Sequence, residues 1–167
     1  MIALKIINKK DFMSKLLASE LFDNYYVEEA TIETFNTFHI DGHINKDFYK
    51  HDVDYTEDSK APVFSRWNDI RSLCFDLIKG KRTPLGFKFI FHPDNETRNK
   101  IVEGCDFSLN PDDVLLGINI RFLGDSITIT TGTAFKIFSM DKTIEKAWDG
   151  YIPSFLSKSN IDTSDYD

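Results

Sequence analysis

The sequence of 167 residues is long enough for one domain with a single core, and its composition excludes several classes of protein. Its hydrophobic fraction of 41%, with fifteen Phe, excludes a disordered chain, and no apolar stretch approaches the roughly 20 residues of a membrane span. The net charge of −7 opposes general nucleic-acid binding, and the two cysteines are too far apart in sequence to suggest a thiol metal site or a disulfide framework.

The amino-terminal residues are too polar for a signal peptide, so we expect a cytoplasmic protein. We expect a single domain over residues 1–161 and a frayed acidic tail at residues 162–167. Ile2, Leu4 and Ile6 alternate with other residues as in a short strand, and Asn8 is suited to cap the helix that follows. The lysines of this helix can face water while its apolar side covers a sheet.

The next segment predicts a first hairpin. Residues Val27 to Ile40 are rich in Thr, Ile and Phe, which favour strands, and Asp41-Gly42 is a strong signal for a two-residue turn. A return strand is expected from Ile44 to about Tyr49. Residues 50–60 are polar without a clear period, which predicts a surface loop.

Three further elements are expected between Pro62 and Gly104. A helix that begins at Pro62 has apolar residues three and four positions apart, and Gly80 ends it. Residues Leu85 to Phe91 alternate as in a strand, and residues Asn95 to Val102 predict a short helix closed by Gly104.

A second hairpin follows, with Gly124-Asp125 at its turn. This register places Arg121 beside Thr128 and Asn119 beside Thr130 on one face, and it leaves the other face almost wholly apolar. A shift of one residue would destroy this separation, so the alternation predicts the pairing.

A last helix, capped by Ser139 or Asp141, carries Ile144 and Trp148 and is expected to break near Pro153. The scattered helices and neighbouring hairpins predict an α+β fold. We expect a largely antiparallel sheet with two hairpins and about four helices packed mainly on one face.

Three long segments are similar to segments of a known family. They are residues 34–49 (TFNTFHIDGHINKDFY), 67–89 (WNDIRSLCFDLIKGKRTPLGFKF) and 130–149 (TTGTAFKIFSMDKTIEKAWD). They resemble a family of short uncharacterised proteins, with a domain of unknown function, from anaerobic Gram-positive bacteria. The resemblance extends over nearly the whole chain and implies a bacterial cytosolic setting, without an activity, a cofactor or a catalytic residue.

Histidines and carboxylates concentrate between residues 39 and 54, and such side chains can hold a divalent metal. In the expected first hairpin His39 and His43 point apart, so they do not share a metal. A site built from His43, Asp47 and His51 is the weaker alternative and would imply a metal-dependent hydrolase. Half-exposed polar residues of a hairpin explain the same pattern, so we expect no metal and no cofactor.

Three cations, Lys79, Lys81 and Arg82, surround the end of the helix after Pro62, and Arg71 lies on that helix. Cations at a helix carboxy terminus interact favourably with the helix dipole without any further function. The alternative is that these four residues bind a phosphate-bearing ligand or a nucleic acid.

The polar face of the second hairpin carries Asn119, Arg121, Thr128 and Thr130. A solvated sheet face explains these residues, and a ligand-binding face is the alternative. The sequence contains no phosphate-binding loop, dinucleotide fingerprint or convincing catalytic triad. The leading hypothesis is therefore a non-catalytic binding domain that uses this face, and an exposed sheet face could equally serve a protein partner or self-association.

Overall fold

The computed structural model of the protein describes residues 1–52, 62–105 and 108–166. Its strands are β1 (Ala3–Ile6), β2 (Tyr26–Glu33), β3 (Thr37–Asp41), β4 (Ser65–Arg66), β5 (Gly86–His92), β6 (Val114–Leu123), β7 (Ser126–Phe135) and β8 (Thr163–Asp165). Its helices are α1 (Lys9–Leu17), α2 (Lys46–Tyr49), α3 (Trp67–Ile78), α4 (Asn95–Gly104) and α5 (Thr143–Lys158), and Pro111–Asp113 form a 3-10 turn.

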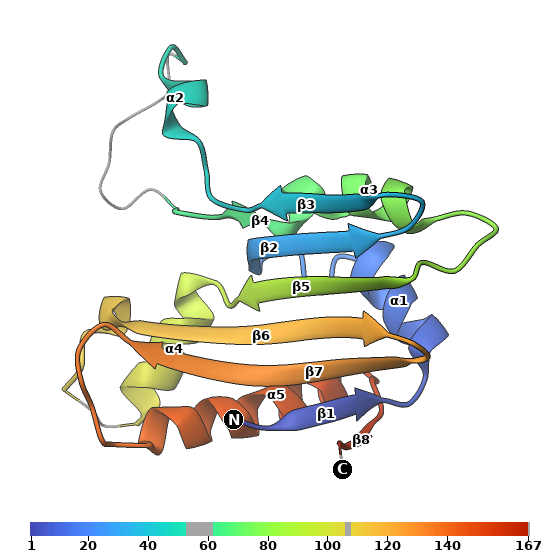
Figure 1. Cartoon of the computed structure of the whole chain (residues 1–167). Coiled ribbons are helices and arrows are strands. Elements are labelled where there is room, and N and C mark those ends of the chain that lie inside the picture. The colour runs from blue at the N-terminus through green and yellow to red at the C-terminus, as the bar shows by residue number, and fades with distance from the viewer. Residues whose placement is uncertain (53–61, 106–107, 167) are drawn as a thin grey trace.

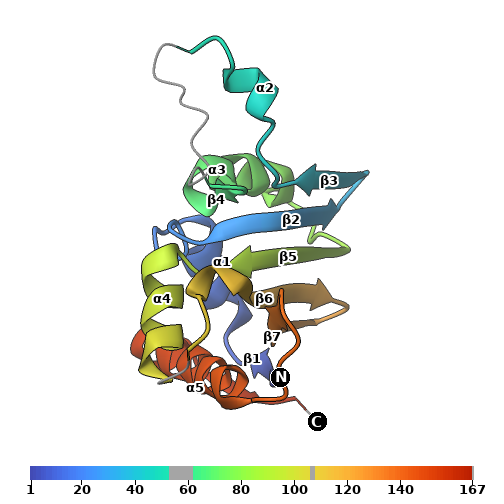
Figure 2. The same cartoon turned by 90° about the vertical axis from the view of Figure 1, so that its left-hand side faces the viewer.

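All strands form one antiparallel sheet with the order β3-β2-β5-β6-β7-β1-β8, and β4 also pairs with β2 (Figure 1). Helices α1, α3, α4 and α5 cover one face of the sheet, and the other face is open (Figure 2). The short helix α2 stands away from the sheet beyond β3 (Figure 1). The expected α+β class is confirmed.

The core lies between the sheet and the helices, where alternate residues of each strand point inward. Phe87, Phe89 and Phe91 of β5 are buried, and the Trp67 ring lies 5.2 Å and 4.9 Å from the rings of Phe89 and Phe91. The buried Trp67 Nε1 donates a hydrogen bond to the carbonyl of Leu16 at 2.8 Å. Burial of each large aromatic contributes about 1.5 to 3 kcal/mol, so this cluster joins α1, α3 and the sheet.

The second hairpin has the predicted register. Arg121 pairs with Thr128 and Asn119 pairs with Thr130, while the apolar residues of both strands face the helices. Gly124 has a φ of 65°, a conformation that suits glycine in a tight hairpin turn.

The first hairpin differs from the prediction. Its turn lies at residues 34–36, and Asp41 pairs with Glu29 at the far end of the hairpin. The expected return strand is also wrong, because residues 46–49 form α2. Gly42 instead allows the backbone at residue 42 to pass close to the backbone of β2. A Cβ at this position would lie 1.6 Å from the carbonyl oxygen of Val27.

Three other boundaries differ from those expected. Helix α3 begins at Trp67 and not at Pro62. Helix α5 continues through Pro153, because a stripe of buried side chains that includes Trp148 packs the helix against the sheet. Nε1 of Trp148 also donates a hydrogen bond to the carbonyl of Gly117 at 2.9 Å. Residues 163–165, for which the sequence predicts a frayed tail, form β8 and pair with β1.

The expected loop at residues 50–60 lies largely outside the described residues. Among the helices that the structure describes, none combines the length and the apolar character needed to cross a membrane.

Candidate functional site

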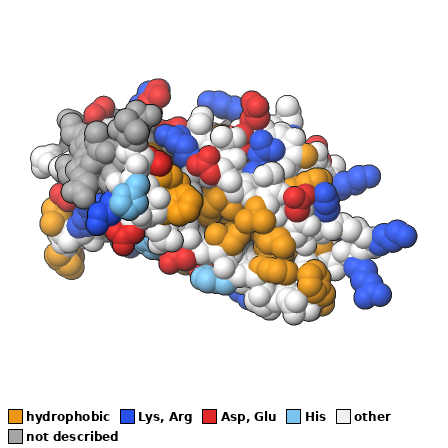
Figure 3. Space-filling model, turned by 90° about the horizontal axis from the view of Figure 1, so that it is seen from above, with side chains coloured by type: hydrophobic (Ala, Val, Ile, Leu, Met, Phe, Trp, Pro, Cys, Tyr) orange, Lys and Arg blue, Asp and Glu red, His pale blue; other side chains and the backbone are white. Residues whose placement is uncertain are grey.

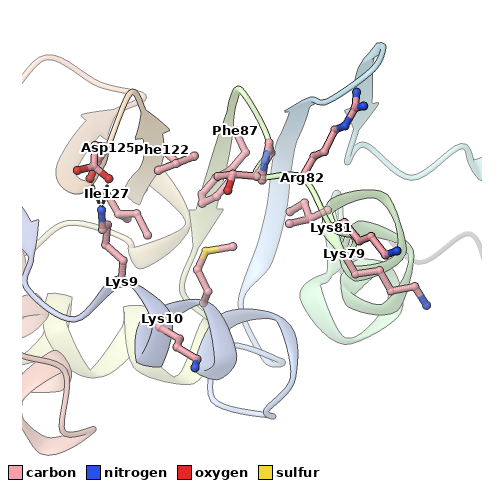
Figure 4. A pocket seen from close by; sticks show the side chains of 14 residues that line it. Lys9, Lys10, Lys79, Lys81, Arg82, Phe87, Phe122, Asp125 and Ile127 are labelled. Atoms are coloured by element: carbon pink, nitrogen blue, oxygen red, sulfur yellow. Dashed lines mark hydrogen bonds and ion pairs between the residues drawn. The ribbon is translucent and has the colours of Figure 1, made fainter.

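A cleft of about 420 Å³ lies where α1 begins, α3 ends and β6 turns into β7 (Figure 4). Its lining residues are Lys9, Lys10, Met13, Ile78, Lys79, Gly80, Lys81, Arg82, Thr83, Pro84, Phe87, Phe122, Asp125 and Ile127. They come from three segments that are far apart in sequence. The volume falls within the range of about 300 to 1,000 Å³ that is usual for small-molecule sites.

The floor of the cleft is apolar. Phe87, Phe122 and Ile127 are directly paired across β5, β6 and β7, and their side chains point toward the helices. The rings of Phe87 and Phe122 are stacked with centroids 5.4 Å apart. Met13 and Ile78 complete the floor from α1 and α3, so the apolar part of a ligand would find apolar contacts here.

The rim of the cleft is cationic. Lys9 forms an ion pair with Asp125, and this contact lowers the pKa of the Asp125 carboxyl. In Figure 4 the side chains of Lys79, Lys81 and Arg82 extend away from the cavity. Lys79 Nζ forms an ion pair with Asp76 at 2.9 Å, and Lys81 and Arg82 are exposed, so these two side chains must turn toward the cavity to meet the charged group of a ligand whose apolar part is inside.

The structure brings together three of the four cations predicted for the basic edge. Arg71 is separate from them, because its guanidinium binds Asp23 with N–O distances of 2.8 Å and 3.2 Å and also donates to the carbonyl of Leu17. This contact links α3 to the segment after α1. The sequence analysis missed Lys9 and Lys10, whose position at the start of α1 carries no local signal that they approach the end of α3.

The four predicted residues of the sheet face, Asn119, Arg121, Thr128 and Thr130, are neighbours on the open face. A second hollow of about 290 Å³ lies on this face beside Arg121 and is lined by Glu29, Thr31, Glu33, Gly86, Phe87, Lys88, Arg121, Phe122 and Leu123. The aromatic residues of β5 and β6 are buried on the helix side. The described central strands therefore offer no aromatic platform on which nucleic-acid bases could stack.

A contact between the buried His92 and the partly exposed Glu28 was not predicted. Nδ1 of His92 lies 2.7 Å from the carbonyl oxygen of Leu116, and Nε2 lies 2.6 Å from a carboxylate oxygen of Glu28. Both ring nitrogens are occupied by these contacts, so neither is open to a substrate. The ring also stacks on Phe64 with centroids 5.4 Å apart, so this contact stabilises the fold.

The sequence analysis missed Glu28 because β2 is irregular at this residue. The register between β2 and β5 shifts between Val27 and Glu29, and this bulge turns Glu28 toward His92. A single sequence does not reveal such a bulge.

The histidines near the first hairpin do not converge. His43 contacts Asp41 at 2.6 Å, and hydrogen bonds from the backbone and ring of His43 lower the pKa of the Asp41 carboxyl. His39 lies beside Thr31 instead. Within the described residues, which include Asp47 and His51, no group of three or more His, Cys, Asp or Glu has the geometry to hold a metal.

A model of a family of unknown function (DUF5721) matches residues 15–164. No curated protein and no solved structure matches the chain. The expected likeness to a family of unknown function is confirmed, whereas its bacterial source remains a prediction. The matched range includes the loop at residues 79–84 and the open sheet face, but it begins after Lys9 and Lys10.

Proposed function

Because the chain belongs to DUF5721, a family of unknown function, its role must be inferred from its own residues, and we propose that it is a non-catalytic binding domain for a small anionic ligand with an apolar body. The observation that supports this proposal is that five of the chain's 20 Lys and Arg residues border one cleft with an apolar floor, although the whole chain carries a net charge of −7. Lys9 and Lys79 are paired with Asp125 and Asp76, and the described residues supply no ion pair for the other three, Lys10, Lys81 and Arg82. A field of this kind favours an anion locally against the charge of the whole protein.

The arrangement favours one binding mode. The apolar part of the ligand lies over Phe87 and Phe122, and its phosphate, sulfonate or carboxylate group lies at the rim. The guanidinium of Arg82 can bind such a group through two parallel hydrogen bonds, whereas Lys81 acts as a point charge. Both side chains are exposed, so ordering them costs rotamer entropy and moderate affinity is expected.

A nucleic acid fits this cleft less well. Its backbone would need a longer track of cations than the five residues at this rim supply. A small ligand needs no such track.

The proposal places the protein in the bacterial cytoplasm. Cys74 and Cys105 are free thiols in the structure, and a buried free thiol such as Cys74 is typical of a reducing compartment.

The test is a titration with 8-anilinonaphthalene-1-sulfonate, an anion with apolar rings whose fluorescence rises on binding. The variant Lys79→Ala/Lys81→Ala/Arg82→Ala removes three exposed charge contacts of about 0.2 to 1 kcal/mol each, so it should bind the dye about 3- to 160-fold more weakly. The matched control is Lys142→Ala/Lys146→Ala/Lys158→Ala, which removes three exposed charges elsewhere and should bind the dye as the unchanged protein does.

Two outcomes would contradict the proposal. Equal dye affinity in the rim variant and the control would exclude the cationic rim as the binding site. Tight binding of mixed-sequence oligonucleotides, with a steep salt dependence that the rim variant loses, would make nucleic acid the ligand.

The open sheet face is a second candidate. Arg121 lies directly opposite Lys88, and like charges in this position are destabilising by up to about 1 kcal/mol unless a carboxylate or another anion compensates. Lys88 contacts Glu29 at 3.2 Å, and the described residues supply no ion pair for Arg121. Phosphate should therefore shift the NMR signals around Arg121, and an Arg121→Gln variant should lose that response.

A further inference from the structure

Among the described residues no strand pairs with the outer edge of β3, and this free edge presents a regular set of backbone groups. Two hydrogen bonds of 2.9 Å, from Thr34 N to Asn36 O and from Gly42 N to Glu28 O, set the alternation along the β2–β3 pair. Because hydrogen-bonded and non-bonded pairs alternate in an antiparallel ladder, residues 38 and 40 bond to β2. The N–H and C=O groups of residues 37, 39 and 41 therefore point out of the sheet.

This edge has few of the protections that natural sheets commonly use: its strand is short and has one charged side chain, Asp41. The strand Thr37–Asp41 contains no Lys, no Pro and no bulge toward its free side. Hydrophobic side chains gather on the surface above it (Figure 3). Phe35 is 83% exposed and Leu73 of α3 is 52% exposed, and Phe38 is only partly buried. An open strand edge with apolar flanks is a template for pairing with another strand.

We propose that the protein forms a homodimer in which the β3 strands of two copies pair antiparallel about a two-fold axis at His39. The outward N–H and C=O groups of residues 37, 39 and 41 are spaced symmetrically about residue 39. When a second copy is turned about the two-fold axis, each of its donors therefore faces an acceptor of the first copy, and each acceptor faces a donor. His39 faces His39 of the partner subunit, and Thr37 faces Asp41 of the partner subunit. Each facing pair exchanges two backbone hydrogen bonds.

The same register also matches the side chains. Phe38 lies opposite Ile40 of the partner subunit in a non-bonded pair, where side chains are closest. Both residues are half-buried on the helix side and would be covered, together with Leu73. On the open face, Thr37 can donate its hydroxyl to the carboxylate of Asp41 of the partner subunit.

Helix α2 is placed to widen this interface. It projects beyond the β3 edge in Figure 1, and Phe48 on it is 82% exposed. A second copy that docks on β3 lies beside α2 and can cover Phe48.

The cationic rim of the cleft takes no part in the strand pairing, so the dimer should persist at high salt, where the binding of an anion to that rim weakens.

The test is sedimentation velocity from about 1 to 200 µM protein, which covers weak and moderate association. We expect the mass to rise to twice that of one chain. In the His39→Lys variant two ammonium groups face each other across the axis, and the dissociation constant should rise by up to about fivefold. This variant keeps its fold, because the His39 side chain is 60% exposed at the edge of the sheet. Thr130→Lys, on the same sheet face but away from the edge, is the control and should dimerise normally.

Amide hydrogen exchange tests the register itself. The amides of residues 37, 39 and 41 should exchange rapidly at low protein concentration and slowly at high concentration, while those of residues 38 and 40 are protected at both. A protein that stays monomeric at every concentration would overturn the proposal. A dimer in which residues 37, 39 and 41 still exchange rapidly, or which His39→Lys leaves intact, would show association through another surface and would overturn it as well.

Discussion

Gly42→Ala and Gly42→Asn should both destabilise the protein strongly, because Gly42 permits a close backbone approach and does not form a turn. A Cβ at position 42 would lie 1.6 Å from the carbonyl oxygen of Val27, whereas real Cβ atoms essentially never come within 3.0 Å of another atom. The obstacle is backbone and cannot rotate away. The segment from Asp41 to His43 would therefore have to move off β2.

The cost follows from what this movement breaks. Gly42 N donates to the carbonyl of Glu28, and Ser65 N donates to the carbonyl of Gly42, both at 2.9 Å. Each lost hydrogen bond costs about 0.5 to 1.5 kcal/mol, and the steric strain adds about 1 to 3 kcal/mol. We expect a loss of about 2 to 6 kcal/mol in the free energy of unfolding and a fall of about 5 to 20 °C in Tm.

The assay is urea unfolding followed by the fluorescence of Trp67 and Trp148, both of which are buried. Gly124 is the matched control, because it has a φ of 65° and no atom lies within 4 Å of its Cβ position. Asn tolerates this conformation better than Ala, so Gly124→Asn should cost less than Gly124→Ala, which should cost about 1 to 2 kcal/mol. At position 42 Ala and Asn should be similarly harmful.

A Gly42→Asn variant within about 0.5 kcal/mol of the unchanged protein would refute this reasoning. It would mean that residue 42 lies in the two-residue turn that the Asp41-Gly42 pattern indicates.

Three further predictions concern single side chains. His92→Leu leaves the Leu116 carbonyl and the Glu28 carboxylate without their donor and should cost about 2 to 4 kcal/mol in urea unfolding, so a neutral effect would contradict the hydrogen-bond assignment. Burial raises the pKa of both thiols, that of Cys74 to about 12, but Cys105 is partly exposed and Cys74 is buried. An alkylating agent at neutral pH should therefore label Cys105 slowly in the native protein and Cys74 only after unfolding, as mass spectrometry can show. Lys9 holds the pKa of Asp125 below the usual 3.8, so the stabilisation by this pair is complete above pH 3.8 and is lost as the pH falls through the lower folded value. In Lys9→Met the carboxyl titration of Asp125, followed by NMR, should return toward 3.8, and an unchanged midpoint would exclude Lys9 as the cause.

The alternation of apolar and polar residues was sufficient to predict the second hairpin. In residues 118–131 each strand has apolar residues on one face and polar residues on the other. Only one register places apolar residues opposite apolar ones and polar residues opposite polar ones, so the pairing follows from local sequence. The cap of α1 was equally local, since Asn8 accepts a hydrogen bond from the Asp11 amide. Three cations of the cleft were predicted for the same reason, because Lys79, Lys81 and Arg82 are close together in sequence.

The remaining features depended on contacts between distant segments. Asp41-Gly42 has the composition of a turn, yet Gly42 is required by the approach of Val27, which lies fifteen positions earlier. Pro153 has the properties of a helix breaker, yet burial of the α5 stripe against the sheet outweighs the lost hydrogen bond.

The sequence by itself determined the α+β class, the second hairpin and the cationic loop after α3, because each depends on residues that are neighbours in the chain. Only the tertiary structure decided that Lys9 and Lys10 join that loop around an apolar cleft, that Arg71 does not, and that β3 ends the sheet with a free edge. These outcomes depend on how α1, α3 and the sheet pack together, and packing energy is summed over contacts between residues far apart in the sequence.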